Sequence, residues 1–453
     1  MEQIKENKMG TAKMLPLLVS MSLPSMFSML IQALYNVVDS IFVARYDIDA
    51  LTAVSYVFPV QMFTMALAVG TAIGVNSLVS RRLGEKRFDD ASNGAMHGIF
   101  LAVCSWIFIS ILAAIITKPF YAMFTDSEKI FNMACSYSNI VIYFSFGIML
   151  HCAIEKILQA TGNMIIPMIL QLVGAITNLI LDPIFIFGLG PIPAMGVEGA
   201  AIATVSGQIL AMTLALFIAF FKKHEIKITF KGFKLHLKTI KDIYVVGFPA
   251  IVMQSIGSVL ISCLNFILTS FGEIAVAVLG VYYKLQSFVF MPVFGLTHGA
   301  MPIMGYSYGA RYKKRLLSAV KLSALIAFGI MLCGMIVFLI FPGELLAIFD
   351  NDAELIQTGI PALRTICLCF PVAGVCIMLS TMFQGVGKGN YSLIISLMRQ
   401  LVVLLPAAYF LSKLGLDYFW WAFPIAEAMS LAASVFLFIR QYHNDIKYLD
   451  GDK

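Results

Sequence analysis

The sequence has few charged residues. Only 12% of its 453 residues are Asp, Glu, Lys or Arg, whereas 60% are hydrophobic, and the mean hydropathy is +0.89. So few charged groups do not suit a surface that faces water on all sides. The composition therefore argues against a soluble protein and indicates a polytopic membrane protein.

The sequence also lacks the motifs of metal and nucleotide chemistry. Its six histidines form no HxxxH or HExxH pair, and its eight cysteines, which lie mostly in apolar stretches, form no CxxC pair. Walker A and Rossmann glycine patterns are missing as well. We therefore expect no metal site, no cofactor and no enzymatic activity. We expect no nucleic-acid partner either, because the basic residues are spread over separate loops.

Apolar stretches long enough to cross a bilayer recur along the whole chain. They lie near residues 14 to 43, 52 to 79, 94 to 117, 134 to 158, 165 to 190, 197 to 221, 243 to 270, 275 to 304, 317 to 341, 360 to 384, 391 to 412 and 418 to 439. The sequence thus predicts an all-α integral membrane protein with twelve transmembrane helices in two pseudo-symmetric six-helix lobes.

The two lobes follow from an internal repeat. Residues match at an offset of 225, as from Pro24 to Pro249 and from Gly162 to Gly387, so that about 220 residues are duplicated. An even number of spans per half makes the repeats parallel, with a cavity expected between them. The predicted division is 1–221 for the N-terminal lobe, 222–242 for a cytoplasmic linker, and 243–453 for the C-terminal lobe and tail.

Basic residues set the predicted orientation. With both termini in the cytoplasm, the inner loops collect most of the lysines and arginines, including seven lysines between Lys222 and Lys241. The outer loops keep only five, among them Arg45 and Lys413. This bias is typical of a multi-pass protein of the cell membrane, and it accounts for the net charge of +6.

Polar side chains gather on spans of the first lobe. Two spans carry them at spacings of three, four or seven residues, which places them along one helix face. These are Gln32, Tyr35, Asn36 and Asp39 on the first span and Gln171, Asn178 and Asp182 on the fifth, where Pro183 follows and weakens the helix ladder. Thr204 and Gln208 lie on the sixth span, and Tyr143 and Glu155 on the fourth.

The repeat shows that the two aspartates are peculiar to the first lobe. Leu264 stands opposite Asp39, and Ala407 stands opposite Asp182. Each acid has a structural interpretation. Asp39 would form an ion pair with Arg45 near the outer surface, and Asp182 would be a buried structural acid held by Asn178 beside the proline. The functional interpretation is a shared proton or cation site, because two carboxylates in one apolar pocket disfavour each other's ionisation.

Other ionisable residues admit more than one interpretation. Glu155 either forms a surface pair with Lys156 or lies on an ion path. Lys284 is intramembrane by position, and we expect Glu427 to be its partner in a structural pair. The spans otherwise contain very few bases. Methionines and phenylalanines near the lobe interface, such as Met291, could line an adaptable apolar cavity with broad specificity.

Four segments resemble the MATE (multidrug and toxic compound extrusion) transporters. They are LYNVVDSIFVAR from Leu34, SRRLGEKR from Ser80, LQATGNMIIP from Leu158 and NLILDPIFIFGLG from Asn178. The resemblance covers nearly the whole chain. It implies a two-lobe secondary antiporter that exports amphipathic or cationic drugs in exchange for protons or sodium by alternating access. It also implies a coupling site of Asp39, Asp182, Asn178, Tyr35 and Thr204.

The sequence differs from one branch of the MATE family. NorM-like members carry acids on helices seven and ten, which are neutral here, so the chain is closer to the DinF-like and MepA-like branches. Gln254, Asn265 and Gln286 then remain as neutral substrate contacts, and Pro24 is the expected hinge of the first helix. We expect a monomer that binds small-molecule drugs within the bilayer.

Three alternatives stay open. A flippase for lipid-linked sugars, from the same superfamily, would need a strongly basic cavity. A channel would need a filter-like loop, and a membrane enzyme would need a catalytic constellation.

Overall fold

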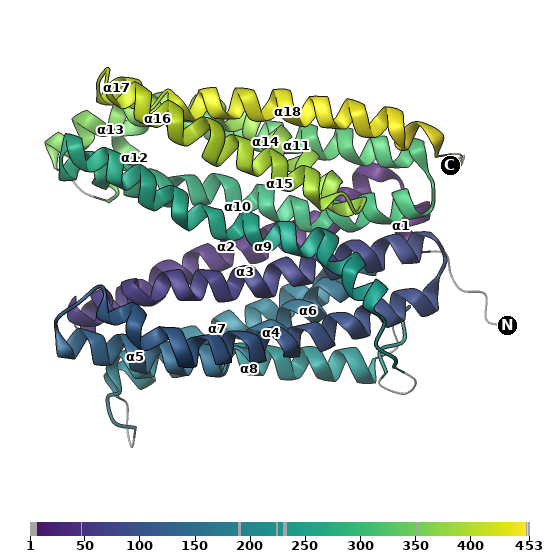
Figure 1. Cartoon of the computed structure of the whole chain (residues 1–453), viewed down its shortest axis with the longest axis horizontal. Coiled ribbons are helices and arrows are strands. Elements are labelled where there is room, and N and C mark those ends of the chain that lie inside the picture. The colour runs from purple at the N-terminus through teal and green to yellow at the C-terminus, as the bar shows by residue number, and fades with distance from the viewer. Residues whose placement is uncertain are drawn as a thin grey trace. The chain divides into compact units, whose positions relative to one another are not determined.

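The computed structural model describes residues 7–46, 48–188, 192–222, 225–229, 233–349, 352–449 and 451; within these ranges the side chains at 35–37, 39–41, 43–46, 48 and 51 are not described. Every regular element in these ranges is a helix (Figure 1). Eleven helical stretches are long and apolar enough to cross a membrane, and a twelfth is added if α5 and α6, which are bent by 41° at their junction, form one span. The predicted all-helical membrane fold is confirmed.

The helices pack into two compact units, Phe27–Gln254 and Met1–Met26 with Ser255–Lys453. We call them the N-terminal unit and the C-terminal unit. Two long helices, α2 (Met14–Tyr46) and α9 (Leu237–Leu268), each contribute one part to each unit. The sequence-based division into lobes at 222–242 does not separate these parts, and it stays a prediction.

The N-terminal unit is completed by six helices. These are α3 (Ile48–Gly84), α4 (Phe88–Ala122), α5 (Glu128–Tyr143), α6 (Phe146–Ala160), α7 (Ile165–Phe187) and α8 (Gly196–Phe221). The predicted linker packs on α4, where the backbone N–H of Lys227 donates to Ser92 Oγ and the backbone N–H of His236 donates to His97 Nε2. The last residues of that linker already belong to α9.

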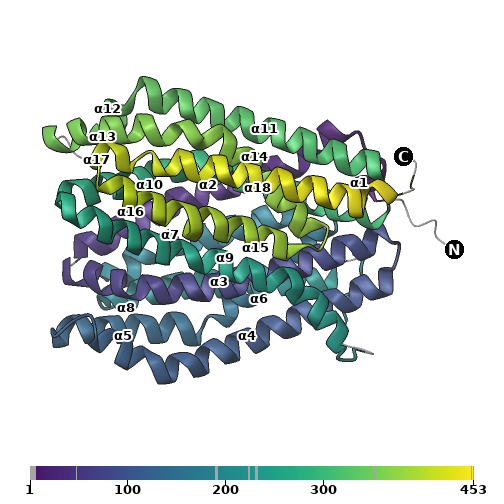
Figure 2. The ribbon, with the colours of Figure 1, turned by 45° about the horizontal axis from the view of Figure 1, so that its top comes forward.

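The C-terminal unit contains the remaining elements (Figure 2). They are α1 (Lys8–Thr11), η1 (Thr269–Phe271), α10 (Glu273–Gly309), α11 (Lys313–Ile340), α12 (Pro342–Ala347), α13 (Ala353–Ile366), η2 (Cys367–Cys369), α14 (Phe370–Gly385), α15 (Gly389–Leu397), η3 (Met398–Leu404), α16 (Leu405–Ser412), α17 (Leu416–Phe419), α18 (Ala422–Asn444) and η4 (Ile446–Tyr448). The η3 segment is a π-helix that joins α15 to α16 within one span.

The duplicated sequence folds with the same backbone conformation at its turns. Gly162 and Gly387, which the offset matches, have positive φ values of 87° and 84°. Each sits just beyond a helix end, where the residue that follows donates its N–H to a carbonyl five residues earlier. Lys86 and Arg311, also matched, have φ values of 60° and 61°. The repeat is therefore structural as well as sequential.

Matched glycines let helices approach backbone to backbone within each unit. A Cβ added to Gly74 on α3 would collide with the carbonyl oxygen of Ile243 and lie 3.0 Å from the backbone nitrogen of Gly247 on α9. In the C-terminal unit, a Cβ on Gly299 of α10 would lie 2.8 Å from the carbonyl carbon of Met21 on α2. Small residues at crossings are the usual means of helix association in membranes.

We expect Gly74→Ala to destabilise the protein although alanine favours helix. Helix propensity gains about 1 kcal/mol, but overpacking against backbone costs roughly 1 to 3 kcal/mol. The matched control is Gly329→Ala on α11, where an added Cβ has no heavy atom within 4 Å. Thermal unfolding in detergent should show a lower midpoint for Gly74→Ala and an unchanged or higher one for Gly329→Ala. Equal midpoints would contradict the close crossing.

Candidate functional site

An extensively packed helix pair of the N-terminal unit carries the candidate site. Helices α7 and α8 pack along much of their length. Glycines allow this, because a Cβ on Gly207 of α8 would lie 2.6 Å from the carbonyl oxygen of Gly174 and 3.4 Å from Asn178 Cβ on α7. Side chains that flank the glycines on the facing surfaces are thus brought within hydrogen-bond range.

Three predicted residues meet at this interface. The side-chain nitrogen of Asn178 donates to Asp182 Oδ2 over 2.7 Å, and the Asn178 side-chain oxygen accepts from Thr204 Oγ1 over 3.0 Å. Asn178 and Asp182 are buried, with Asp182 fully shielded. Thr204 therefore fixes the amide of Asn178 in the orientation that presents its N–H to the carboxylate.

A second contact ties α7 to α2. Gln171 Nε2 donates to Gln32 Oε1, so the polar faces predicted on the first and fifth spans do face each other at this level. The side chains of Tyr35, Asn36 and Asp39 lie outside the described residues. Their positions on α2 follow Gln32 by one or two turns.

Gln208 on α8 lies one turn beyond Thr204. Its side-chain oxygen is buried and makes no hydrogen bond within the described part of the chain. An unsatisfied amide oxygen inside a membrane protein is costly unless water or a ligand reaches it. Gln208 thus remains a candidate contact for an ion or substrate.

The two candidates of the fourth predicted span lie elsewhere in the unit. Tyr143 is 40% exposed, at the bend between α5 and α6. Glu155 is buried on α6 and accepts from Gln159 Nε2 over 2.8 Å, while Lys156 Nζ donates to Gln159 Oε1 over 2.8 Å. The interpretation of Glu155 and Lys156 as a surface pair is wrong, because both are buried behind α3, where Asn76 binds the Lys156 carbonyl.

The neutral candidates near the C-terminal unit do not converge on a described cluster. Gln254 is exposed, and Asn265, Gln286 and Met291 are half-buried. Within the described residues, none of their side chains takes part in a hydrogen bond. Their role as substrate contacts stays a prediction.

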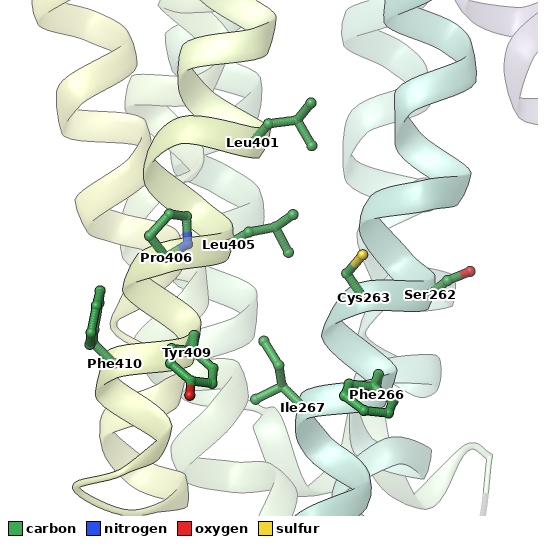
Figure 3. Close-up of a pocket in the computed structure, with 9 residues that line it drawn as sticks. All are labelled: Ser262, Cys263, Phe266, Ile267, Leu401, Leu405, Pro406, Tyr409 and Phe410. Carbon is green, nitrogen blue, oxygen red and sulfur yellow. The ribbon is translucent and has the colours of Figure 1, made fainter.

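An apolar groove occupies the C-terminal unit between α9 and the η3–α16 segment. Its volume is about 570 Å³, and it is lined by Ser262, Cys263, Phe266, Ile267, Leu401, Leu405, Pro406, Tyr409 and Phe410. Leu401 and Leu405 point toward α9, and Cys263 and Ile267 point back toward them (Figure 3). Leu264 and Ala407, the repeat partners of Asp39 and Asp182, neighbour these residues in sequence. The second repeat thus has an apolar surface near the counterpart of the acidic site.

The structure corrects one predicted ion pair. Glu427 on α18 accepts from Arg399 Nη1 over 2.9 Å, so its partner is Arg399 and not Lys284. The side chain of Lys284 is exposed on α10, and its Nζ lies 5.7 Å from the centre of the Phe349 ring. The sequence contained a signal for Arg399, namely an arginine in the middle of an apolar span, that our sequence reasoning overlooked.

Both predicted hinge prolines lie inside continuous helices, Pro24 in α2 and Pro183 in α7. Pro24 is flanked by the residues that α10 approaches at Gly295 and Gly299. Pro183 directly follows Asp182. A hinge role for either proline stays a prediction.

Comparison with known proteins decides the family. The MatE family profile matches the chain twice, over residues 24–184 and 249–410, which together make up more than half of its length. The two matches start at the repeat-related prolines. The chain belongs to the MATE family of transporters.

Relatives of this MATE transporter agree over most of their length. A FAD transporter of Shewanella oneidensis is 25% identical over 86% of each chain, and the multidrug export protein MepA of Staphylococcus aureus is 24% identical over 92% of each. A crystal structure of MATE in complex with MaL6 superposes with a TM-score of 0.92 at 27% identity and covers 99% of each chain. An outward-facing multidrug resistance MATE transporter gives a TM-score of 0.91 at 29% identity, with 98% and 99% covered.

The buried pair on α6 generates a stability prediction for this MATE transporter. Lys156 Nζ lies 3.7 Å from Glu155 Oε1, and Gln159 bridges the two groups. Breaking a buried pair leaves an uncompensated charge and costs about 3 kcal/mol or more. We expect Lys156→Met to lower the thermal midpoint strongly and Glu155→Gln/Lys156→Met to recover most of the loss.

The exposed pair of Lys129 and Asp49 supplies the control for this measurement. Their atoms are 2.7 Å apart, but the side chains are 54% and 45% exposed. Water screens such a pair, so Lys129→Met should leave the midpoint nearly unchanged. A double variant on α6 that is no more stable than Lys156→Met alone would contradict the pairing.

Proposed function

We propose that this MATE transporter is a secondary active exporter of amphipathic or cationic organic compounds, driven by the influx of protons or sodium. The main support is that Asp182 is fully buried and accepts a hydrogen bond from Asn178, whose side chain is oriented by Thr204. A carboxylate within a membrane span costs free energy to bury, and such residues are therefore functional-site candidates by default. Both termini are proposed to be cytoplasmic, from the bias of basic loops.

The proposed coupling site joins Asp182 to Asp39. The first and fifth spans run in the same direction, and the Gln32–Gln171 contact sets their register. Asp39 follows Gln32 by seven residues, as Asn178 follows Gln171. Asp39 is thereby expected at the depth of Asn178, about 10 Å along the helix axes from the glutamine pair. Tyr35, one turn before Asp39, is proposed to share this site.

Export then follows from linkage. A proton or sodium ion that binds between the two acids removes one of their two negative charges and draws α2 toward α7, with Pro24 as the proposed hinge. A drug that needs the open arrangement of these helices binds less well once the cation is bound. Such competition requires only that each ligand prefers a different state.

The substrate class rests on two kinds of support. Proteins similar to this chain are described as multidrug export proteins and as a FAD transporter. The buried Asp182 favours compounds with a positive group, and the apolar groove of the C-terminal unit suits an apolar body. A flippase for lipid-linked pyrophosphates is less well supported, because Asp182 would repel its substrate.

Liposome efflux tests the proposal. Purified protein should export a fluorescent cationic dye under an imposed proton gradient or an imposed sodium gradient. Asp182→Asn is nearly isosteric but cannot carry the charge, so efflux should fall to the level of empty liposomes. Asp90→Asn on α4, an exposed acid bonded to Arg87, is the matched control and should retain efflux.

Each outcome of the efflux assay is informative. Loss in both Asp182→Asn and Asp39→Asn, with normal folding, supports a shared coupling site, and the effective gradient identifies the ion. Normal gradient-driven efflux in Asp182→Asn would reject that residue as a coupling group. Wild-type protein that moves no dye under either gradient would reject the proposed export function.

A further inference from the structure

Arg399 lies deep within a membrane span of the C-terminal unit. The span Gly389–Ser412 is continuous through the π-helix η3, and Arg399 is its eleventh residue. At 1.5 Å per residue this is about 15 Å from the start of the span, or half of a hydrocarbon core of about 30 Å. A charge at this depth must face protein or water, and such residues mark functional sites by default.

The ion pair that holds Arg399 is incomplete. Only Nη1 donates, to Glu427 Oε1 over 2.9 Å. Within the described part of the chain, Nε and Nη2 of Arg399 make no hydrogen bond, and the buried Oε2 of Glu427 makes none either. Arginine and carboxylate groups frequently pair through two parallel bonds. Here the geometry leaves donors on the arginine that a second acceptor can use.

Arg399 and Glu427 differ in how far their side chains are exposed. The Arg399 side chain is 29% exposed, whereas that of Glu427 is only 11% exposed. Glu427 thus anchors the guanidinium from the protein interior while part of Arg399 remains accessible. A partly exposed arginine at mid-bilayer depth is expected to face water and not lipid.

A purely structural pair would not need this arrangement. Well-packed apolar residues in place of a buried ion pair are often as stabilising or more so. The π-helix is a further sign, because such segments occur frequently at functional sites. It changes the helix register at Arg399 and lets this side chain reach α18 from within the span.

We propose that Arg399 binds a carboxylate or phosphate group of the transported compound, with Glu427 as the residue that positions the guanidinium. This inference rests on the proposed export function and narrows its substrate class. The compounds concerned are amphipathic zwitterions, whose anionic group lies at Arg399. A lipid headgroup is disfavoured as the source of the anion, because it would lie about 15 Å away at the bilayer surface.

Two dyes that differ in one group test the proposal. A rhodamine with a free carboxylate and its methyl ester share the same apolar cationic body, but only the acid offers an anion. Binding of each to purified protein in nanodiscs is measured by fluorescence anisotropy. R399Q should weaken binding of the acid by about tenfold, the effect of one charge-assisted hydrogen bond, and leave the ester unchanged.

The partner variants exclude a merely structural effect. E427Q keeps a side-chain oxygen that can accept from Arg399 Nη1 and so hold the guanidinium in place, but it removes the competing negative charge, so it should bind the acid as tightly as wild type or more tightly. R399Q/E427Q removes both charges and should be as stable as wild type, yet bind the acid as weakly as R399Q. Thermal midpoints are recorded for all variants. If R399Q or the double variant binds acid and ester with unchanged relative affinity, the proposal is wrong.

The same assay separates this inference from the export proposal. Wild-type protein that binds the acid through Arg399 but shows no gradient-driven efflux of the ester would retain the anion site and reject the exporter. Gradient-driven efflux of the ester with no effect of R399Q on acid binding would retain the exporter and reject the anion site. Preferential binding of anionic phospholipid vesicles that is lost in R399Q would also overturn the proposal, since it assigns the anion to a lipid.

Discussion

Close backbone contact at glycines is the constraint on which the rest of the structure depends. Burial from water does not drive helices together inside a bilayer, so packing must supply the attraction. Gly74 admits α9 to α3 in the N-terminal unit, and its repeat partner Gly299 admits α2 to α10 in the C-terminal unit. Because α2 and α9 each contribute to both units, each of these crossings ties one part of such a helix to the unit that contains it.

The candidate site uses the same device. Gly207 brings α8 against α7, and this approach places Thr204 beside Asn178. The duplicated scaffold would accept equivalent residues in both halves, but only the first repeat carries the acids. The second repeat has an apolar groove near the corresponding place and sets its own ion pair, Arg399 with Glu427, on a π-helix. The scaffold is symmetric, and the chemistry is not.

Hydropathy and the repeat predicted the helical spans, and the spacing of polar residues placed Gln32 on α2 and Gln171 on α7 on faces that meet. Those features depend on local pattern. The partner of Glu427 does not depend on local pattern, because any of several helices could face α18. The π-helix η3 also alters which side chain of its span reaches α18. The surface-pair interpretation of Glu155 failed for a related reason: its position near a helix end suggested water, whereas α3 covers that end. Its place on an ion path stays a prediction.

Two ionisable groups meet the cost of the bilayer in different ways. Asp182 accepts a hydrogen bond from a neutral amide, so the pair carries a net negative charge when Asp182 is ionised. A bound proton or cation would cancel that charge. Arg399 accompanies a carboxylate, so the pair is neutral and the guanidinium can remain charged throughout a transport cycle. The first arrangement suits a group whose occupancy must change in each cycle. The second suits the proposed role of Arg399, which is to recognise substrate without changing its own protonation.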